Sequence, residues 1–136
     1  MSALFFQGLL NFAIYFSVAI LLLIVFKFVY TLITPHDEWE LIKKEQNLAA
    51  SIGLGGSIIG FAIALFGVIS QSVSLYDFLA WSLVALLAQC LAFAVVRFLF
   101  MPRIVQRIRE NEVSAGVILG SVNIAVGLLN AASMTY

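Results

Sequence analysis

The chain is 136 residues long, 63% of its residues are hydrophobic, and only 10% are charged. A water-soluble domain carries about a quarter charged residues, so this composition excludes a soluble enzyme, a nucleic-acid-binding protein and a disordered linker. The seven basic and seven acidic side chains cancel, so net charge indicates no partner. The composition predicts an integral membrane protein.

Long apolar runs, free of charge except near their ends, predict four transmembrane helices near residues 8–30, 49–70, 78–100 and 113–133. A helix needs about 20 apolar residues to cross roughly 30 Å of hydrocarbon. The runs do not alternate between polar and apolar residues, which excludes a β-barrel, and only helices then satisfy the backbone in lipid. We therefore predict one all-α integral membrane domain over residues 1–136.

The first connection is expected to hold a short helix at the membrane surface. Thr34 is predicted to be its N-cap and Pro35 its first residue, with Asp37 and Glu38 in the first turn. His36, the only histidine, is interpreted as part of this solvated helix start. A metal site is the alternative, but neighbours in sequence do not converge on one ion from a helix.

Small residues recur along the second and fourth predicted helices. Those expected to pack helices together are Gly53, Gly56, Gly60, Gly116, Gly120 and Gly127. Two pairs of them match the small-xxx-small pattern, which lets helix backbones approach closely in lipid. Packing within one subunit and packing between subunits both remain open. Because small residues are so abundant, we expect a homo-oligomer with the second or fourth helix at its interface.

Three amide side chains lie at membrane depth: Gln89 in the third helix, and Asn123 and Asn130 on one face of the fourth. A buried amide needs hydrogen-bond partners. Hydrogen bonds between helices are the first interpretation, and the lining of a pore in an oligomer is the second. No Asp, Glu or Lys is expected at mid-membrane, which removes the usual signature of a proton relay or an ion-coupled carrier.

The third connection carries a basic amphipathic segment. Apolar residues after position 100 follow helical spacing, while Arg103, Arg107 and Arg109 lie on or near another face. Such a segment suits an anionic lipid surface or a cytoplasmic partner. The alternative is that these arginines only set the topology.

The basic residues predict the orientation, because all seven flank the first or the third connection. They are Lys27, Lys43, Lys44, Arg97, Arg103, Arg107 and Arg109. Short, positively charged loops stay in the cytoplasm. We therefore expect a multi-pass protein of the bacterial inner membrane with both termini, and the turn at 70–78, on the periplasmic side.

The two halves of the chain, about 8–70 and 78–133, look alike. Each has a membrane helix, a proline, a charged stretch and a helix rich in small residues. Each unit crosses the membrane twice, so the copies run parallel, unlike the inverted repeats of many transporters. The predicted fold is thus four transmembrane helices from two parallel-repeated two-helix units, joined by short amphipathic cytoplasmic helices.

Catalytic and cofactor patterns are missing from the sequence. It has no glycine-rich phosphate loop, nucleophile elbow or zinc spacing. Cys90 lies in a membrane helix without a histidine and is interpreted as a small apolar filler. We expect no enzyme activity, no cofactor, no bound metal and no nucleic acid.

Three segments, Ile33–Ile42, Asn47–Ser51 and Asn130–Tyr136, resemble the YjfL family of uncharacterised bacterial inner-membrane proteins. Family members carry a duplicated two-helix unit, and Glu112 stands where the second unit of the family has the asparagine of Asn-x-Ala-Ala. Related genes often lie beside phage-shock-type membrane-stress proteins, so the resemblance implies such a cytoplasmic partner. Our hypothesis is a membrane-stress-associated anchor or scaffold in the lipid bilayer, and the alternative is a small homo-oligomeric channel or transporter.

Overall fold

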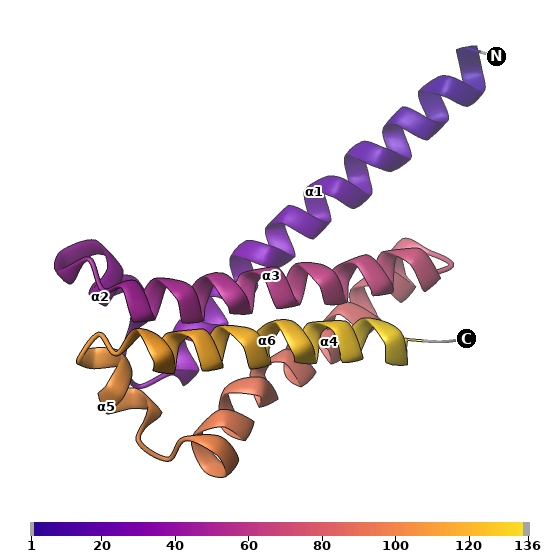
Figure 1. Ribbon diagram of the computed structural model, residues 1–136. Coiled ribbons are helices and arrows are strands. Elements are labelled where there is room, and N and C mark those ends of the chain that lie inside the picture. Colours follow the sequence, from indigo (N-terminus) through magenta and orange to yellow (C-terminus); the bar gives the residue numbers. More distant parts are fainter. Residues whose placement is uncertain (1, 135–136) are drawn as a thin grey trace.

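Every regular element is a helix in residues 2–134, the part of the chain that the computed structural model describes (Figure 1). In chain order the elements are α1 (Ser2–Ile33), α2 (Glu38–Glu45), α3 (Leu48–Gln71), α4 (Leu75–Val95), the π-helical turn η1 (Val96–Phe100), α5 (Ile104–Arg109) and α6 (Val113–Ser133). Residues 135 and 136, the last two of the third family-like segment, lie outside the described residues.

The prediction of four membrane-spanning helices is confirmed. Helices α1, α3 and α6, and α4 continued by η1, are long and apolar enough to cross a membrane. The first helix is longer than the predicted 8–30, because no proline interrupts the apolar run before Pro35. Its 32 residues span about 48 Å, more than the hydrocarbon thickness of roughly 30 Å, which a tilted helix accommodates. Figure 1 shows α1 diverging from the other helices toward its N-terminus.

Helices α3 and α6 form the centre of the bundle, running side by side in the same direction (Figure 1). Their backbones meet at glycines: Gly56 lies against Gly120, and a Cβ added to Gly116 would lie 2.7 Å from the Cα of Ala49. Such separations leave no space for a side chain, so only glycine fits there. The contact matches the pattern by which helices associate in lipid.

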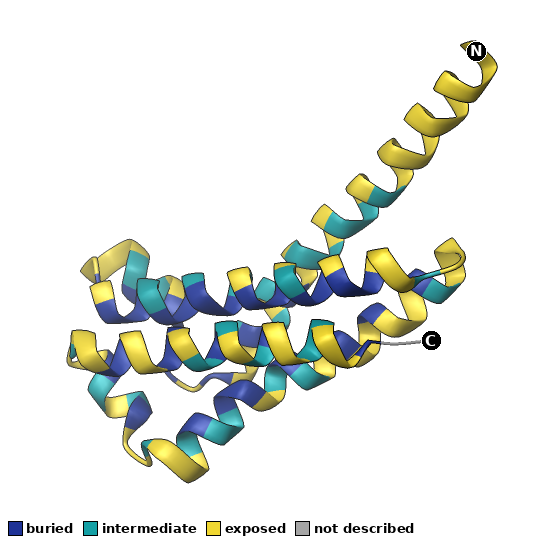
Figure 2. Ribbon diagram, turned by 45° about the vertical axis from the view of Figure 1, so that its right-hand side comes forward, coloured by how far each residue is buried: buried dark blue, intermediate teal, exposed yellow. Residues whose placement is uncertain are grey.

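Aromatic side chains fill the space between α1, α3 and α4. The rings of Phe26 and Phe61 stack with 4.5 Å between their centroids, and Tyr15 stacks on Phe78 at 5.4 Å. Buried residues line the facing sides of the central helices, whereas the first part of α1 is exposed throughout (Figure 2). The core therefore runs along the length of α3, from Ala49 to Val68, and α1 contributes its buried residues only through Phe26 and Tyr30.

The first connection differs from the expectation. Asp37, not Thr34, is the N-cap of α2, and its side chain accepts a hydrogen bond from the backbone N–H of Glu40 at 3.3 Å. Thr34 is buried. Its hydroxyl contacts the last turn of α1 and the carboxylate of Glu38. After the turn at Pro35, the side chains of His36 and Glu38 are buried against the bundle, whereas Asp37 stays exposed.

Candidate functional site

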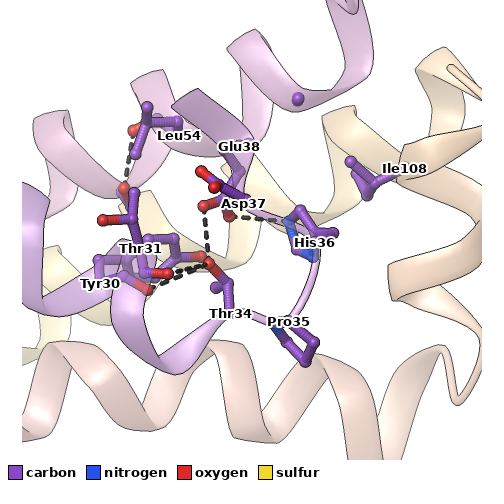
Figure 3. Close-up of polar contacts among 12 residues, drawn as sticks. Tyr30, Thr31, Thr34, Pro35, His36, Asp37, Glu38, Leu54 and Ile108 are labelled. Atoms are coloured by element: carbon purple, nitrogen blue, oxygen red, sulfur yellow. Dashed lines mark hydrogen bonds and ion pairs between the residues drawn. The ribbon is translucent and has the colours of Figure 1, made fainter. Parts of the chain in front are cut away.

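Three polar side chains are buried where α1 turns into α2, and we call them the acid cluster: Thr34, His36 and Glu38 (Figure 3). The Nε2 atom of His36 lies 2.8 Å from one carboxylate oxygen of Glu38, and neither side chain has any exposed surface. The Thr34 hydroxyl lies 2.7 Å from the other carboxylate oxygen and 3.1 Å from the backbone oxygen of Tyr30. The interpretation of His36 as part of a solvated helix start is therefore wrong.

The surroundings of the acid cluster are apolar and aromatic. The ring of Phe93 lies 5.7 Å from the His36 ring and 6.3 Å from the Tyr30 ring, measured between centroids. An unpaired charge in such surroundings costs several kcal/mol. The hydrogen bond from Thr34 to one oxygen of Glu38 and the nearby Nε2 of His36 offset part of the cost of burying these polar groups. No local spacing in the sequence indicates this burial.

A second polar network lies deeper in the bundle and involves two of the predicted amides. Gln89 donates a hydrogen bond to the backbone oxygen of Asn123 at 2.6 Å. The Asn123 amide donates to the hydroxyl of Tyr30 at 3.1 Å and to the backbone oxygen of Gly53 at 3.2 Å. These bonds join α4 to α6, and α6 to α1 and α3, within one subunit.

Close helix packing makes room for this network. A Cβ added to Gly60 would lie 2.5 Å from the Nε2 atom of Gln89, so this glycine admits the amide. The third predicted amide, Asn130, lies apart from the network and donates to the backbone oxygen of Ala85 at 3.0 Å. The structure thus brings Gln89 and Asn123 together and places Asn130 nearer the other end of α6.

Some buried polar atoms of the described residues have no hydrogen-bond partner. They include Oε1 of Gln89, Oδ1 of Asn123 and Oγ of Ser82. A buried polar group without a partner costs about 1–3 kcal/mol. These buried oxygen atoms are therefore available to accept a hydrogen bond from a water molecule or to contact a small cation.

Hydrogen bonds join the two connections into one surface at the same end of the bundle (Figure 1). Arg109 on α5 donates to the backbone oxygen of Pro35 at 2.8 Å. Asn47, the N-cap of α3, donates to the backbone oxygen of Ile108 at 2.7 Å. In the opposite direction, the side chain of Asn111 accepts from the backbone N–H of Ala49 at 3.0 Å.

Asn111 was missed by the sequence analysis, which considered only Glu112 at the corresponding position. Glu112 makes no capping hydrogen bond and instead accepts from Nε of Arg107 at 2.7 Å. Asn111 has a positive φ of 60°, a conformation that asparagine adopts more readily than most residues. Asn111, one position before Glu112, therefore makes the hydrogen bond that joins the second half of the chain to α3 in the first half.

The charged side chains at this end have different surroundings. Arg107 pairs with Glu112 and Arg109 binds the first connection, whereas Arg103 and Lys43 are exposed and have no ion-pair partner among the described residues. The Nζ atom of Lys44 lies 2.6 Å from a carboxylate oxygen of Glu40. Its hydrogen bond and positive charge lower the pKa of the Glu40 carboxyl. Arg103 and Lys43 are therefore two basic side chains at this surface that are free to contact another molecule.

Within residues 2–134, no three His, Cys, Asp or Glu side chains are close enough to hold a metal ion. The geometry defines a multi-pass helical membrane protein with polar networks in its interior and a charged surface at one end. The family described as a domain of unknown function, DUF350, matches residues 3–134. The chain belongs to this family.

Curated relatives support the assignment. The chain is 41% identical over 130 residues to the UPF0719 inner membrane protein YjfL of Escherichia coli K12, covering 96% of this chain and 97% of that protein. It is 36% identical over 122 residues to the UPF0719 transmembrane protein YshE of Bacillus subtilis, covering 88% of each. The resemblance to the YjfL family is confirmed, and these names agree with a membrane location.

A UPF0719 transmembrane protein of Aquifex aeolicus is more distant, at 26% identity over 129 residues that cover 89% of this chain and 48% of that protein. No solved structure matches the chain significantly. The family is uncharacterised, so its function has to be inferred from the geometry.

Proposed function

We propose that this protein is a non-enzymatic component of the inner membrane that anchors or organises a cytoplasmic membrane-stress partner. The observation that supports this proposal is the hydrogen bond between Arg109 and the backbone of Pro35, which joins the two connections into one surface. A partner would then meet a preformed surface, and it would not have to order two separate loops when it binds. A preformed surface reduces the entropy cost of binding.

The distribution of charge supports the same proposal. Every charged residue of the sequence except Asp77 belongs to or borders these two connections. Arg103, the N-cap of α5, and Lys43 on α2 are exposed and are available to an acidic partner. The proposed partner, as the family resemblance implies, is a peripheral protein of the phage-shock type.

Site-specific photo-crosslinking in cells tests this function. A photoreactive residue at position 103 or 43 is expected to capture the same peripheral membrane-stress protein, whereas one at Val73, exposed at the other end of the bundle, is not. The double change Arg103→Glu and Lys43→Glu should reduce capture from a third position, Gln106, which is also exposed. Equal capture from both ends, or capture unaffected by the charge reversal, would overturn the proposal.

We also propose that the subunits assemble into a homo-oligomer. The glycines that first indicated assembly contact the neighbouring helix within the subunit, so we place the subunit interface on the outward side of the α3–α6 pair. An apolar groove of about 320 Å³ lies there, and Gly55 in its wall has open space around it. Gly55→Leu is therefore expected to dissociate the oligomer without unfolding the subunit. A wild-type monomer in lipid nanodiscs at all concentrations would refute this proposal.

A second candidate function is a small channel or transporter. It is supported by the unpartnered acceptors on Gln89 and Asn123 and by the ionisable pair His36–Glu38, because ionisable groups inside a membrane protein often mark an ion or proton path. Flux of protons or potassium ions into liposomes should then fall for Asn123→Leu and Glu38→Gln. Flux that is unchanged by both substitutions would count against this function.

A further inference from the structure

An apolar groove follows the line along which α1 diverges from α3. On α1 it is lined by Phe16, Ile20 and Leu23 and ends at Lys27. On α3 the facing residues are three or four positions apart: Ile58, Ala62, Leu65 and Ile69. The groove has two adjoining parts of about 280 and 250 Å³ that share Leu23.

Among the residues that the structure describes, Lys27 is the only one with a charged side chain in the lining of this groove. Its ammonium group lies 4.3 Å from the centre of the Trp39 ring and 4.5 Å from that of Phe28. Among the described residues no carboxylate lies within ion-pair distance of it. The positive charge at the end of the groove is therefore available to an anion.

The dimensions of the groove indicate what occupies it. It extends over twelve residues of each helix, from 16 to 27 and from 58 to 69, and the end residues are about 16 Å apart at a rise of 1.5 Å per residue. Half of a hydrocarbon core of roughly 30 Å is about 15 Å, so the groove matches the depth of one leaflet. Its charged end lies on the same side as α2, because Lys27 contacts Trp39 of that helix. Tryptophan is enriched at the membrane–water interface.

We propose that this groove is a binding site for one anionic phospholipid, with an acyl chain between α1 and α3 and the headgroup phosphate at Lys27. Basic pockets between transmembrane helices on the cytoplasmic side are typical sites for anionic headgroups. The indole N–H of Trp39 has no hydrogen-bond acceptor within the described part of the chain and is a second donor for the phosphate. The competing occupant is a helix of a second copy, about 10 Å across, which would need an acidic side chain to pair with Lys27. The only acidic residue in the described membrane helices is Asp77, at the opposite end of the bundle.

Native mass spectrometry of protein released from nanodiscs with equal amounts of phosphatidylglycerol and phosphatidylcholine tests the proposal. The wild-type protein is expected to retain one phosphatidylglycerol in preference to phosphatidylcholine by about fivefold, the ratio expected for one lysine charge at the membrane surface. Lys27→Gln should abolish the preference. Lys27→Arg, which keeps the charge, and Lys43→Gln, which removes an exposed lysine outside the groove, should both preserve it.

A groove-filling substitution provides the second arm. Ala62 is exposed in the groove wall, so Ala62→Phe should fill the groove and reduce retention of both lipids. Circular dichroism and thermal unfolding identify any variant that is misfolded, and Lys27→Gln decides the matter if Ala62→Phe does not fold. Equal retention of the two lipids by the wild type, or a preference that survives Lys27→Gln, would overturn the proposal. Loss of a dimer in Ala62→Phe with unchanged lipid retention would instead assign the groove to a second copy.

Discussion

Glu38 is a carboxylate without exposed surface, and its two polar neighbours make this burial tolerable. His36 and Thr34 each contact one of its oxygens, at 2.8 and 2.7 Å. The Thr34 hydroxyl also lies 3.1 Å from the backbone oxygen of Tyr30. The cluster therefore ties the end of α1 to the start of α2.

Removing the Glu38 carboxylate should destabilise the fold. Glu38→Ala leaves His36 buried without its partner and is expected to lower the free energy of unfolding by about 3 kcal/mol. Thermal unfolding in lipid nanodiscs, followed by circular dichroism, measures the change. The matched control is Glu40→Ala on the same helix, which removes only an exposed contact with Lys44 and should leave the unfolding temperature unchanged. Equal effects of the two substitutions would show that the acid cluster contributes nothing specific.

Helices α3 and α6 are held together by the close approach of their backbones rather than by large side chains. Lipid tails are as apolar as leucine, so burying a leucine between helices brings little gain, whereas close packing brings van der Waals contact. Contacts at Gly56–Gly120 and Gly67–Ala131 run in the same order along both helices. The separation along the chain between the two residues of each contact is close to the offset at which the two halves of the sequence align. The internal repeat stays a prediction, and this parallel pairing favours it.

A methyl group at Gly127 should separate these helices. Its Cβ would lie 2.6 Å from the Cα of Gly60 on α3, a backbone atom that cannot move without moving the helix. Gly127→Ala is therefore expected to lower the free energy of unfolding by about 2 kcal/mol, within the range for overpacked sites. The comparison is Gly8→Ala on α1, where a Cβ meets nothing within 4 Å. Reversible unfolding in mixed micelles should show a loss for the first variant and none for the second.

The whole molecule is polar at one end and apolar over the rest of its length. Both connections, with nearly all charged residues, lie at the end where α2 and α5 are found (Figure 1). The positive-inside rule predicts that this end faces the cytoplasm. This orientation stays a prediction, and the proposed partner surface depends on it, whereas the proposed lipid site requires only an anionic lipid in the leaflet that Lys27 faces.

Cysteine labelling in intact cells checks the orientation. In a background with Cys90→Ala, a membrane-impermeant maleimide should label Val73→Cys from outside, because residue 73 lies at the predicted periplasmic turn and is exposed. Lys43→Cys, also exposed, should be labelled only after the membrane is permeabilised. The reverse pattern would invert the topology and remove the basis for a cytoplasmic partner.

Sequence by itself determined the fold class, because crossing a bilayer needs only length, apolar composition and satisfied backbone hydrogen bonds. The same reasoning placed the glycines and the intramembrane amides on the second, third and fourth spans. These predictions rest on local properties of one segment at a time, and lipid imposes the same requirement on every segment.

The environment of individual polar residues was decided only by the tertiary structure. His36 and Glu38 follow a proline in a hydrophilic stretch. This local sequence is compatible both with a segment that faces water and with one that packs against Phe93, as His36 does here. The partners of Asn47 and Asn111 lie about sixty residues away in sequence. Burial and hydrogen bonding between distant residues depend on how the helices pack, and no property of a single segment contains that information.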